Sequence, residues 1–67
     1  MKWAYGLVQE KEGLVLCEIY FKDIKDEPVM YVPVDWEEIN SNKQTKQVIK
    51  DIKQQIKHKR FLKKEDF

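Results

Sequence analysis

Side chains that could do chemistry are few in this chain, and their spacing forms no catalytic set. His58 is the only imidazole, and its neighbours Lys57, Lys59 and Arg60 provide no carboxylate to orient a general base. Cys17 is the only cysteine, and it falls inside an apolar run, where a thiol behaves as a small hydrophobic group. We therefore interpret His58 as a solvated surface residue and Cys17 as a core residue, and we predict that the chain is not an enzyme.

Sites for metals, cofactors or small substrates find no support in the sequence either. The only glycines, Gly6 and Gly13, are too few for a phosphate-binding loop. A structural zinc ion takes four ligands, and only Cys17 and His58 could supply soft ones. One group of carboxylates lacks the spacing and the glycine of a calcium loop: Asp23, Asp26 and Glu27. We predict no metal, no cofactor and no small-molecule substrate.

The length and the cysteine content limit the fold and its location. The chain has 67 residues, enough for one small domain, and its single cysteine excludes a disulfide within the chain. A lone thiol suits a reducing compartment. No run approaches the roughly 18 consecutive apolar residues of a membrane-spanning helix, and the N-terminus lacks the layout of a signal peptide. We expect one soluble, cytoplasmic domain over residues 1–67 with no membrane contact.

Strands are predicted in the first part of the chain, where apolar residues recur with a period near two. The expected ranges are about 3–9, 14–22 and 29–34, all rich in aromatic and β-branched residues. Pro33 cannot donate a hydrogen bond to a neighbouring strand, so the third strand belongs at an edge. The prediction is an antiparallel meander with the second strand in the centre.

The loop between the first two strands determines which residues share a face. A three-residue loop over 11–13, with Gly13 in a left-handed conformation, is a common hairpin closure. It pairs Trp3 with Phe21 and Leu7 with Cys17. The expected core face then carries Trp3, Tyr5, Leu7, Val15, Cys17, Ile19 and Phe21. The opposite face carries Ala4, Gly6, Val8, Leu14, Leu16, Glu18 and Tyr20.

One long helix is predicted at about 42–60, followed by a basic tail over 61–67. Asp35 and Glu38 have capping-box spacing for a short helical turn, and Ser41 and Gln44 have the same spacing before the long helix. The helix carries an apolar stripe with steps of three and four: Thr45, Val48, Ile49, Ile52 and Ile56. The fold class is therefore α+β: a three-stranded antiparallel β-meander with one long C-terminal helix packed on one face, in the order β-β-β-α.

Two segments carry a resemblance to other proteins. The opening Trp3-Ala4-Tyr5 and the run Glu18-Ile19-Tyr20-Phe21 resemble a group of short uncharacterised microbial proteins. In that group, the first strand carries the pattern Trp-x-Tyr. A second strand with the pattern Glu-(Ile/Val)-Tyr-(Phe/Tyr) and a C-terminal helix follow. The resemblance covers about the first third of the chain, and it implies an α+β fold without an assigned activity.

Charge is divided unequally along the chain. Residues 1–40 hold four lysines and nine acids, a net charge of −5, whereas residues 41–64 hold nine bases and one acid, a net charge of +8. Basic residues of the second part step by three and four and so predict one helical ridge: Lys43, Lys46, Lys50, Lys53, Lys57, Arg60 and Lys64. The ridge is either a solvated flank of the helix or an anion-binding surface, for an acidic protein or for nucleic-acid phosphates without sequence preference.

The leading functional hypothesis is a non-catalytic interaction module that self-associates through its sheet. A helix that covers one face of a three-stranded sheet leaves the other face open, and exposed apolar patches typically mark interfaces. The predicted interface comprises Val8, Leu14, Leu16, Glu18 and Tyr20. Either two such faces stack or the first strand pairs across a two-fold axis, and the partner is a second copy or another protein. The alternative is a non-specific nucleic-acid-binding protein that uses the basic ridge.

Overall fold

The sheet is mixed and has one strand more than expected. The computed structural model describes residues 2–22 and 27–67; Asp23 and Asp26, named above in a group of carboxylates, lie outside the described residues. Its elements are β1 (Lys2–Glu10), β2 (Gly13–Phe21), β3 (Pro28–Pro33), α1 (Trp36–Ser41), α2 (Thr45–Lys57), β4 (Leu62–Lys63) and a 3₁₀ turn, η1 (Lys64–Asp66). The strand order is β3-β2-β1-β4, antiparallel except that β4 runs parallel to β1.

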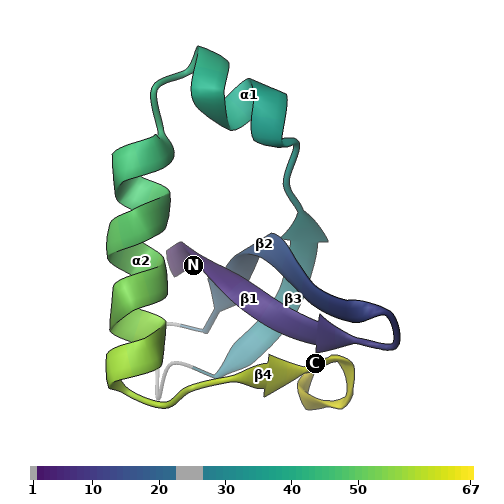
Figure 1. Cartoon of the computed structure of the whole chain (residues 1–67). Coiled ribbons are helices and arrows are strands. Elements are labelled where there is room, and N and C mark those ends of the chain that lie inside the picture. The colour runs from purple at the N-terminus through teal and green to yellow at the C-terminus, as the bar shows by residue number, and fades with distance from the viewer. Residues whose placement is uncertain (1, 23–26) are drawn as a thin grey trace.

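The arrangement confirms an α+β fold with one main helix and with β2 between β1 and β3. Pro33 lies on β3 at the sheet edge, as its missing N–H predicts. Figure 1 shows α2 beside the sheet next to β1, with α1 at one end of α2 and the C-terminal segment at the other.

The register of the first hairpin differs from the prediction by one residue. Glu10 pairs with Gly13, so the loop has two residues, and Trp3 lies opposite Tyr20 instead of Phe21. Gly13 begins β2 instead of closing the loop. Its φ of 131° is accessible to glycine because glycine has no Cβ. A one-residue shift moves every β2 side chain to the other face relative to β1, so the predicted face assignments are wrong.

Both faces of the curled sheet are covered by apolar clusters. On the face toward the helices, Tyr5, Ile39 and Val48 are buried together, with a half-buried shell of Leu16, Val34 and Ile52. On the opposite face, Val8, Cys17, Ile19 and Leu62 form a second buried cluster, packed against Val15, Phe21, Tyr31 and Phe67. We call these sides the helix face and the tail face. The expectation that one face stays open is therefore wrong.

The C-terminal segment, predicted as a basic tail, belongs to the fold. Leu62 pairs with Val8 as the start of β4 and is buried in the tail-face cluster. The ring of Phe67 lies 4.7 Å from that of Tyr31, centroid to centroid. The N–H of Lys63 donates to Oδ2 of Asp66 at 2.7 Å, which holds the turn that brings Phe67 back to the sheet. These contacts complete the tail-face core.

The two helices end in the same way, and neither end uses a glycine. After α2, the N–H of Lys59 donates to the carbonyl of Ile56 and that of Arg60 to Gln55, both at 3.1 Å, which is the Schellman pattern. Lys59 adopts φ 51° at the left-handed position. After α1 the same pattern places Lys43 at φ 56°. The helix predicted over 42–60 is therefore only Thr45–Lys57.

Of the two predicted helix starts, only the N-cap at Asp35 is confirmed. Asp35 is the N-cap of α1, and its Oδ1 accepts a hydrogen bond from the N–H of Glu37 at 3.0 Å. Ser41, in contrast, is the last residue of α1, and Gln44 is the N-cap of α2 without a side-chain hydrogen bond. The second predicted box is therefore wrong, because the chain is still helical at Ser41.

Candidate interaction surface

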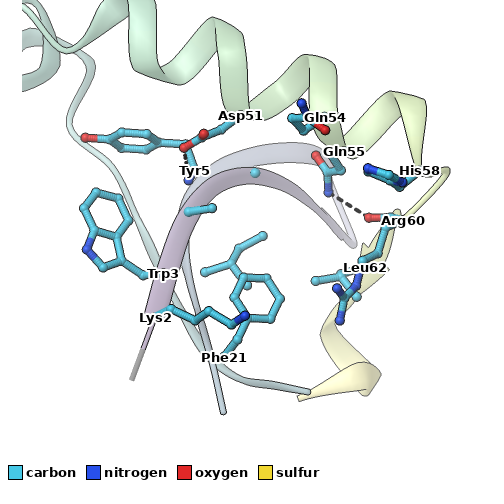
Figure 2. Close-up of a pocket in the computed structure, with 13 residues that line it drawn as sticks. Lys2, Trp3, Tyr5, Phe21, Asp51, Gln54, Gln55, His58, Arg60 and Leu62 are labelled. Carbon is cyan, nitrogen blue, oxygen red and sulfur yellow. Dashed lines mark hydrogen bonds between the residues drawn. The ribbon is translucent and has the colours of Figure 1, made fainter. Parts of the chain in front are cut away.

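Two side chains of α2 bind the outer edge of β1. The N–H of Tyr5 donates to Oδ2 of Asp51 at 3.0 Å, and the N–H of Leu7 donates to Oε1 of Gln55 at 2.8 Å. The Gln55 amide donates in turn to the carbonyl of Leu7 at 2.8 Å and to that of Arg60 at 3.1 Å. Figure 2 shows Asp51 and Gln55 reaching from the helix to the strand. Because β4 pairs with β1 at Val8 and Gln9, contacts within the chain occupy much of the outer edge of β1 between Tyr5 and Gln9.

A pocket of about 280 Å³ lies between β1, α2 and the start of β4 (Figure 2). Its floor includes Gly6 and Ile19, and the Arg60 guanidinium lies 5.1 Å from the ring centroid of Phe21 in the same wall. A Cβ at Gly6 would come 2.5 Å from Cδ1 of Ile19, so only glycine fits there without rearrangement. The lack of a side chain at Gly6 thus lets Ile19 of β2 lie directly against β1 in the lining of this pocket.

The chemistry available in this pocket is limited. His58 and Asp51 both line it, which the sequence did not reveal. The Asp51 carboxylate is already engaged, because Oδ2 accepts from Tyr5 and Oδ1 accepts from the Gln47 amide at 2.8 Å. No serine, threonine or cysteine is among the described lining residues. Among the described lining residues, His58 therefore has no serine, threonine or cysteine to activate.

An exposed patch of mixed chemistry lies on the helix face, beyond the area that the helices cover. The register places Trp3, Tyr20 and Met30 in one row across β1, β2 and β3, and Tyr5, Glu18 and Val32 in the next. Trp3 and Met30 are each 47% exposed and Val32 is 42% exposed. We call Trp3, Glu18, Tyr20, Met30 and Val32 the sheet patch. Three large apolar side chains so exposed on one sheet face are typical of an interaction surface.

Ring contacts and one hydrogen bond order the sheet patch. The rings of Trp3 and Tyr5 meet edge to face, with centroids 5.0 Å apart and an interplanar angle of 85°. The Trp3 and Tyr20 centroids are 6.3 Å apart. The Tyr20 hydroxyl donates to Oε1 of Glu18 at 2.6 Å, and this bond raises the pKa of Tyr20 because it stabilises the neutral phenol. The aromatic rings are therefore fixed around a carboxylate.

A groove of about 660 Å³ separates the sheet patch from α1. Its acidic members are Glu18 on β2, Asp35 before α1 and Glu38 on α1. None of the described residues that line it is basic. Burial raises the pKa of Tyr5, and the negative charges of Glu18, Asp51 and Glu38 raise it further. The hydroxyl of Tyr5 thus lies in a region of negative potential.

The outer surface of α2 presents a second uncovered area. Val48, Ile52 and Gln55 face the sheet, whereas Ile49 and Ile56 remain 49% and 54% exposed. These two isoleucines are seven residues apart, two helical turns, and so lie on one side of the helix. We call them the helix flank. Their exposure contradicts the expectation that the whole apolar stripe docks on the sheet.

Next to the helix flank lie four lysines of the predicted ridge. Lys46, Lys50, Lys53 and Lys57 are exposed on α2, and at 100° per residue they fall within an arc of about 60° on the side away from the sheet. The other three predicted members are outside α2: Lys43 precedes it, Arg60 follows it, and Lys64 begins η1. The continuous seven-residue helical ridge is therefore wrong, and we use "basic ridge" below for the four lysines of α2.

The predicted interface residues are dispersed by the observed register. Val8 is 0% exposed within the tail-face cluster, and Leu16 packs half-buried against the helix-face cluster. Leu14 is exposed at the hairpin end of β2. Glu18 and Tyr20 do belong to one exposed region, the sheet patch. Sequence reasoning missed Trp3 because its face relative to β2 depends on the two-residue hairpin loop, and it missed Met30 and Val32 because their face depends on the pairing of β3 with β2.

Cys17 and the potential metal ligands among the described residues form no further site. Cys17 is fully buried, and burial together with the charge of Glu10 raises its pKa to about 11, so its thiol stays protonated at neutral pH. Within 2–22 and 27–67, no three His, Cys, Asp or Glu side chains are placed to hold a metal ion. Neither described helix is long and apolar enough to cross a membrane.

No protein-family model matches this chain, and it has no match among curated proteins or solved structures. A functional assignment therefore depends on the surfaces described above.

Proposed function

We propose that the protein is a non-catalytic interaction module that self-associates, with the sheet patch of one copy against the helix flank and basic ridge of a second. The observation that carries this proposal is the cross-strand row of Trp3, Tyr20 and Met30, which leaves an aromatic and apolar surface exposed. Burying such a surface against another chain gains roughly 25 cal/mol per Å² of apolar area.

Charge complementarity supports a second copy as the partner. The groove beside the sheet patch is bordered by the carboxylates of Glu18, Asp35 and Glu38. The helix flank, Ile49 and Ile56, is bordered by the basic ridge. Each copy therefore presents an apolar surface with an acidic border and another with a basic border. Opposite charges at the rim guide association and orient the partners.

A two-fold dimer would use both surfaces of both copies. In such a dimer the sheet patch of the first copy contacts α2 of the second, and the sheet patch of the second copy contacts α2 of the first. The chain has only 67 residues, so forming this dimer would remove a large share of its surface from water. A cytoplasmic location belongs to the same proposal, because the single Cys17 suits a reducing compartment.

Sedimentation equilibrium tests the proposal directly. We expect wild type to have twice the monomer mass at high micromolar concentration, and Val32→Lys to be monomeric because it places a cation in the centre of the sheet patch. Leu14→Lys is the matched control: it also charges an exposed apolar residue of the sheet, but outside the patch. A monomeric wild type, or equal effects of the two lysines, contradicts the proposal.

The exposure of all four lysines of the basic ridge favours a second candidate function, phosphate-driven binding of nucleic acid. On this alternative, generic DNA and RNA would shift in a gel at low salt, and the shift would weaken steeply as salt rises. Replacement of Lys46, Lys50, Lys53 and Lys57 by Gln would remove it without unfolding the domain. Absence of a wild-type shift at low salt removes this candidate.

A further inference from the structure

Tyr5 is a buried residue that lines the groove between the sheet patch and α1, and its hydroxyl bonds to none of the described residues. The Tyr5 side chain is 6% exposed, and none of the residues in 2–22 and 27–67 hydrogen bonds its hydroxyl. Figure 2 shows this hydroxyl at the end of the ring near Trp3, away from Gln55 and His58. Buried hydroxyls in proteins usually have a partner, and one that lacks it calls for an explanation.

The residues around this hydroxyl determine which kind of ligand group the groove can bind. The edge-to-face rings of Trp3 and Tyr5 form a corner in the groove wall. The carboxylates of Glu18, Asp35 and Glu38 line the same groove, which has no basic residue among those described. Aromatic faces attract cations, and carboxylates and a phenol oxygen accept hydrogen bonds from an ammonium group. A carboxylate or phosphate would meet only negative charge here.

We propose that this groove binds the ammonium group of a lysine side chain, donated by the basic ridge of the second copy. The inference rests on the self-association proposed above and names the contact that would specify it. The ammonium would donate to the Tyr5 hydroxyl and to Glu38, while its methylenes lie on the ring of Trp3. Lysine suits this geometry because its long apolar stem carries a compact charge with three donors.

A free probe tests the ammonium site apart from the dimer. The probe is Nα-acetyl-lysine methylamide, and its Nε-acetylated form has the same stem without the charge. Binding is followed by Trp3 fluorescence in a Trp36→Phe background, since these are the two tryptophans. We expect the charged probe to bind at least tenfold more tightly, and to dissociate the dimer at matched ionic strength when the acetylated probe does not. Equal binding of the two probes overturns the inference.

Two variants distinguish recognition from folding. Tyr5→Phe should leave the melting temperature within a few degrees of wild type, because the hydroxyl has no partner to lose, yet weaken probe binding at least threefold. Glu38→Gln should weaken it as well, whereas Glu12→Gln in the hairpin loop, the matched control, should not. Retained binding in Tyr5→Phe overturns the inference.

The outcomes separate the inference from the proposed function. A wild type that is monomeric at all concentrations but still prefers the charged probe contradicts self-association and supports the ammonium site. A wild-type dimer whose groove does not discriminate the probes supports self-association and overturns the site. A dimer that survives replacement of all four ridge lysines by Gln overturns the second copy as the source of the ammonium.

Discussion

At the scale of single residues, the contact between Gly6 and Ile19 shows how closely β2 packs on β1. The Cβ of an alanine at position 6 would lie 2.5 Å from Cδ1 of Ile19, a side chain that is 2% exposed and would have to shift. Overpacking of this kind costs about 1–3 kcal/mol. We expect Gly6→Ala to lower the free energy of unfolding by that amount in urea titrations.

A second substitution checks the cause of this loss. Ile19→Val removes the Cδ1 atom that meets the new methyl group, so Gly6→Ala with Ile19→Val should be less destabilised than the sum of the two single variants. Gly13→Ala is not a suitable comparison, because Gly13 has φ 131° and its substitution strains the backbone instead. Additive losses in the double variant would contradict the packing explanation.

Cys17 makes stability dependent on alkaline pH. Its pKa is raised from 9.0 to about 11 in the folded state, because burial and the charge of Glu10 disfavour the thiolate. A raised folded-state pKa contributes stability that is complete below the unfolded value and is lost as pH rises toward the folded value. Between pH 9 and 11, urea unfolding should show a loss of about 2 kcal/mol from this thiol.

The control for the pH dependence is Cys17→Ala. Tyr5, Tyr20 and Tyr31 also have a raised pKa, so wild type loses additional stability over the same alkaline range. The difference between wild type and Cys17→Ala isolates the thiol, and the alanine variant should have the shallower slope. Parallel curves for the two proteins would show that Cys17 does not resist ionisation in the folded state.

At the scale of elements, Gln55 attaches α2 to the sheet. Its side-chain amide hydrogen bonds both the N–H and the carbonyl of Leu7, at 2.8 Å each. Gln55→Ala would leave these two backbone groups without their partner, at a cost of about 1–3 kcal/mol. Thermal unfolding measures the loss, and Gln54→Ala, its exposed neighbour on the helix, should stay within about 0.5 kcal/mol of wild type. Equal melting temperatures for the two variants would contradict this role of Gln55.

The same scale shows which elements were predictable. Period-two segments identified β1, β2 and β3, and the three-and-four pattern identified α2. The helix ends were misplaced because Lys43 and Lys59 occupy left-handed positions that usually belong to glycine. β4 was missed because two residues show no periodicity, and Leu62 is recognised as core only once β1 is beside it.

The candidate site was harder to predict than the helices and strands, because it depends on strand register, which local sequence patterns do not determine. Glu18 and Tyr20 were predicted as interface residues from the sheet face they share, and two residues that alternate on one strand keep a common face in either register. Val8 was assigned to the wrong face, since a hairpin loop of two residues instead of three reverses the pairing of the strands. Met30 and Val32 join the surface only through the register of β3.

At the scale of the whole molecule, the unequal charge distribution acquires a spatial meaning. The acids of residues 1–40 include those that border the groove, and the bases of residues 41–64 include the ridge on the far side of α2. The two charged borders therefore lie on different surfaces of one chain. Such an arrangement suits reciprocal contact between copies, because each surface finds its complement on the other chain.

The central claim, self-association of the sheet patch with α2, is tested most directly by mixing two charge-reversed variants. One carries Lys46, Lys50, Lys53 and Lys57 changed to Glu; the other carries Glu18 and Glu38 changed to Lys, which reverses the border of the groove and keeps Asp35 as the N-cap of α1. Each alone should be monomeric and folded, because its two surfaces now have the same sign. In a two-fold heterodimer both contacts again join opposite charges, so sedimentation equilibrium of the mixture should give twice the monomer mass. Two folded variants that remain monomeric when mixed, beside a dimeric wild type, would contradict the account.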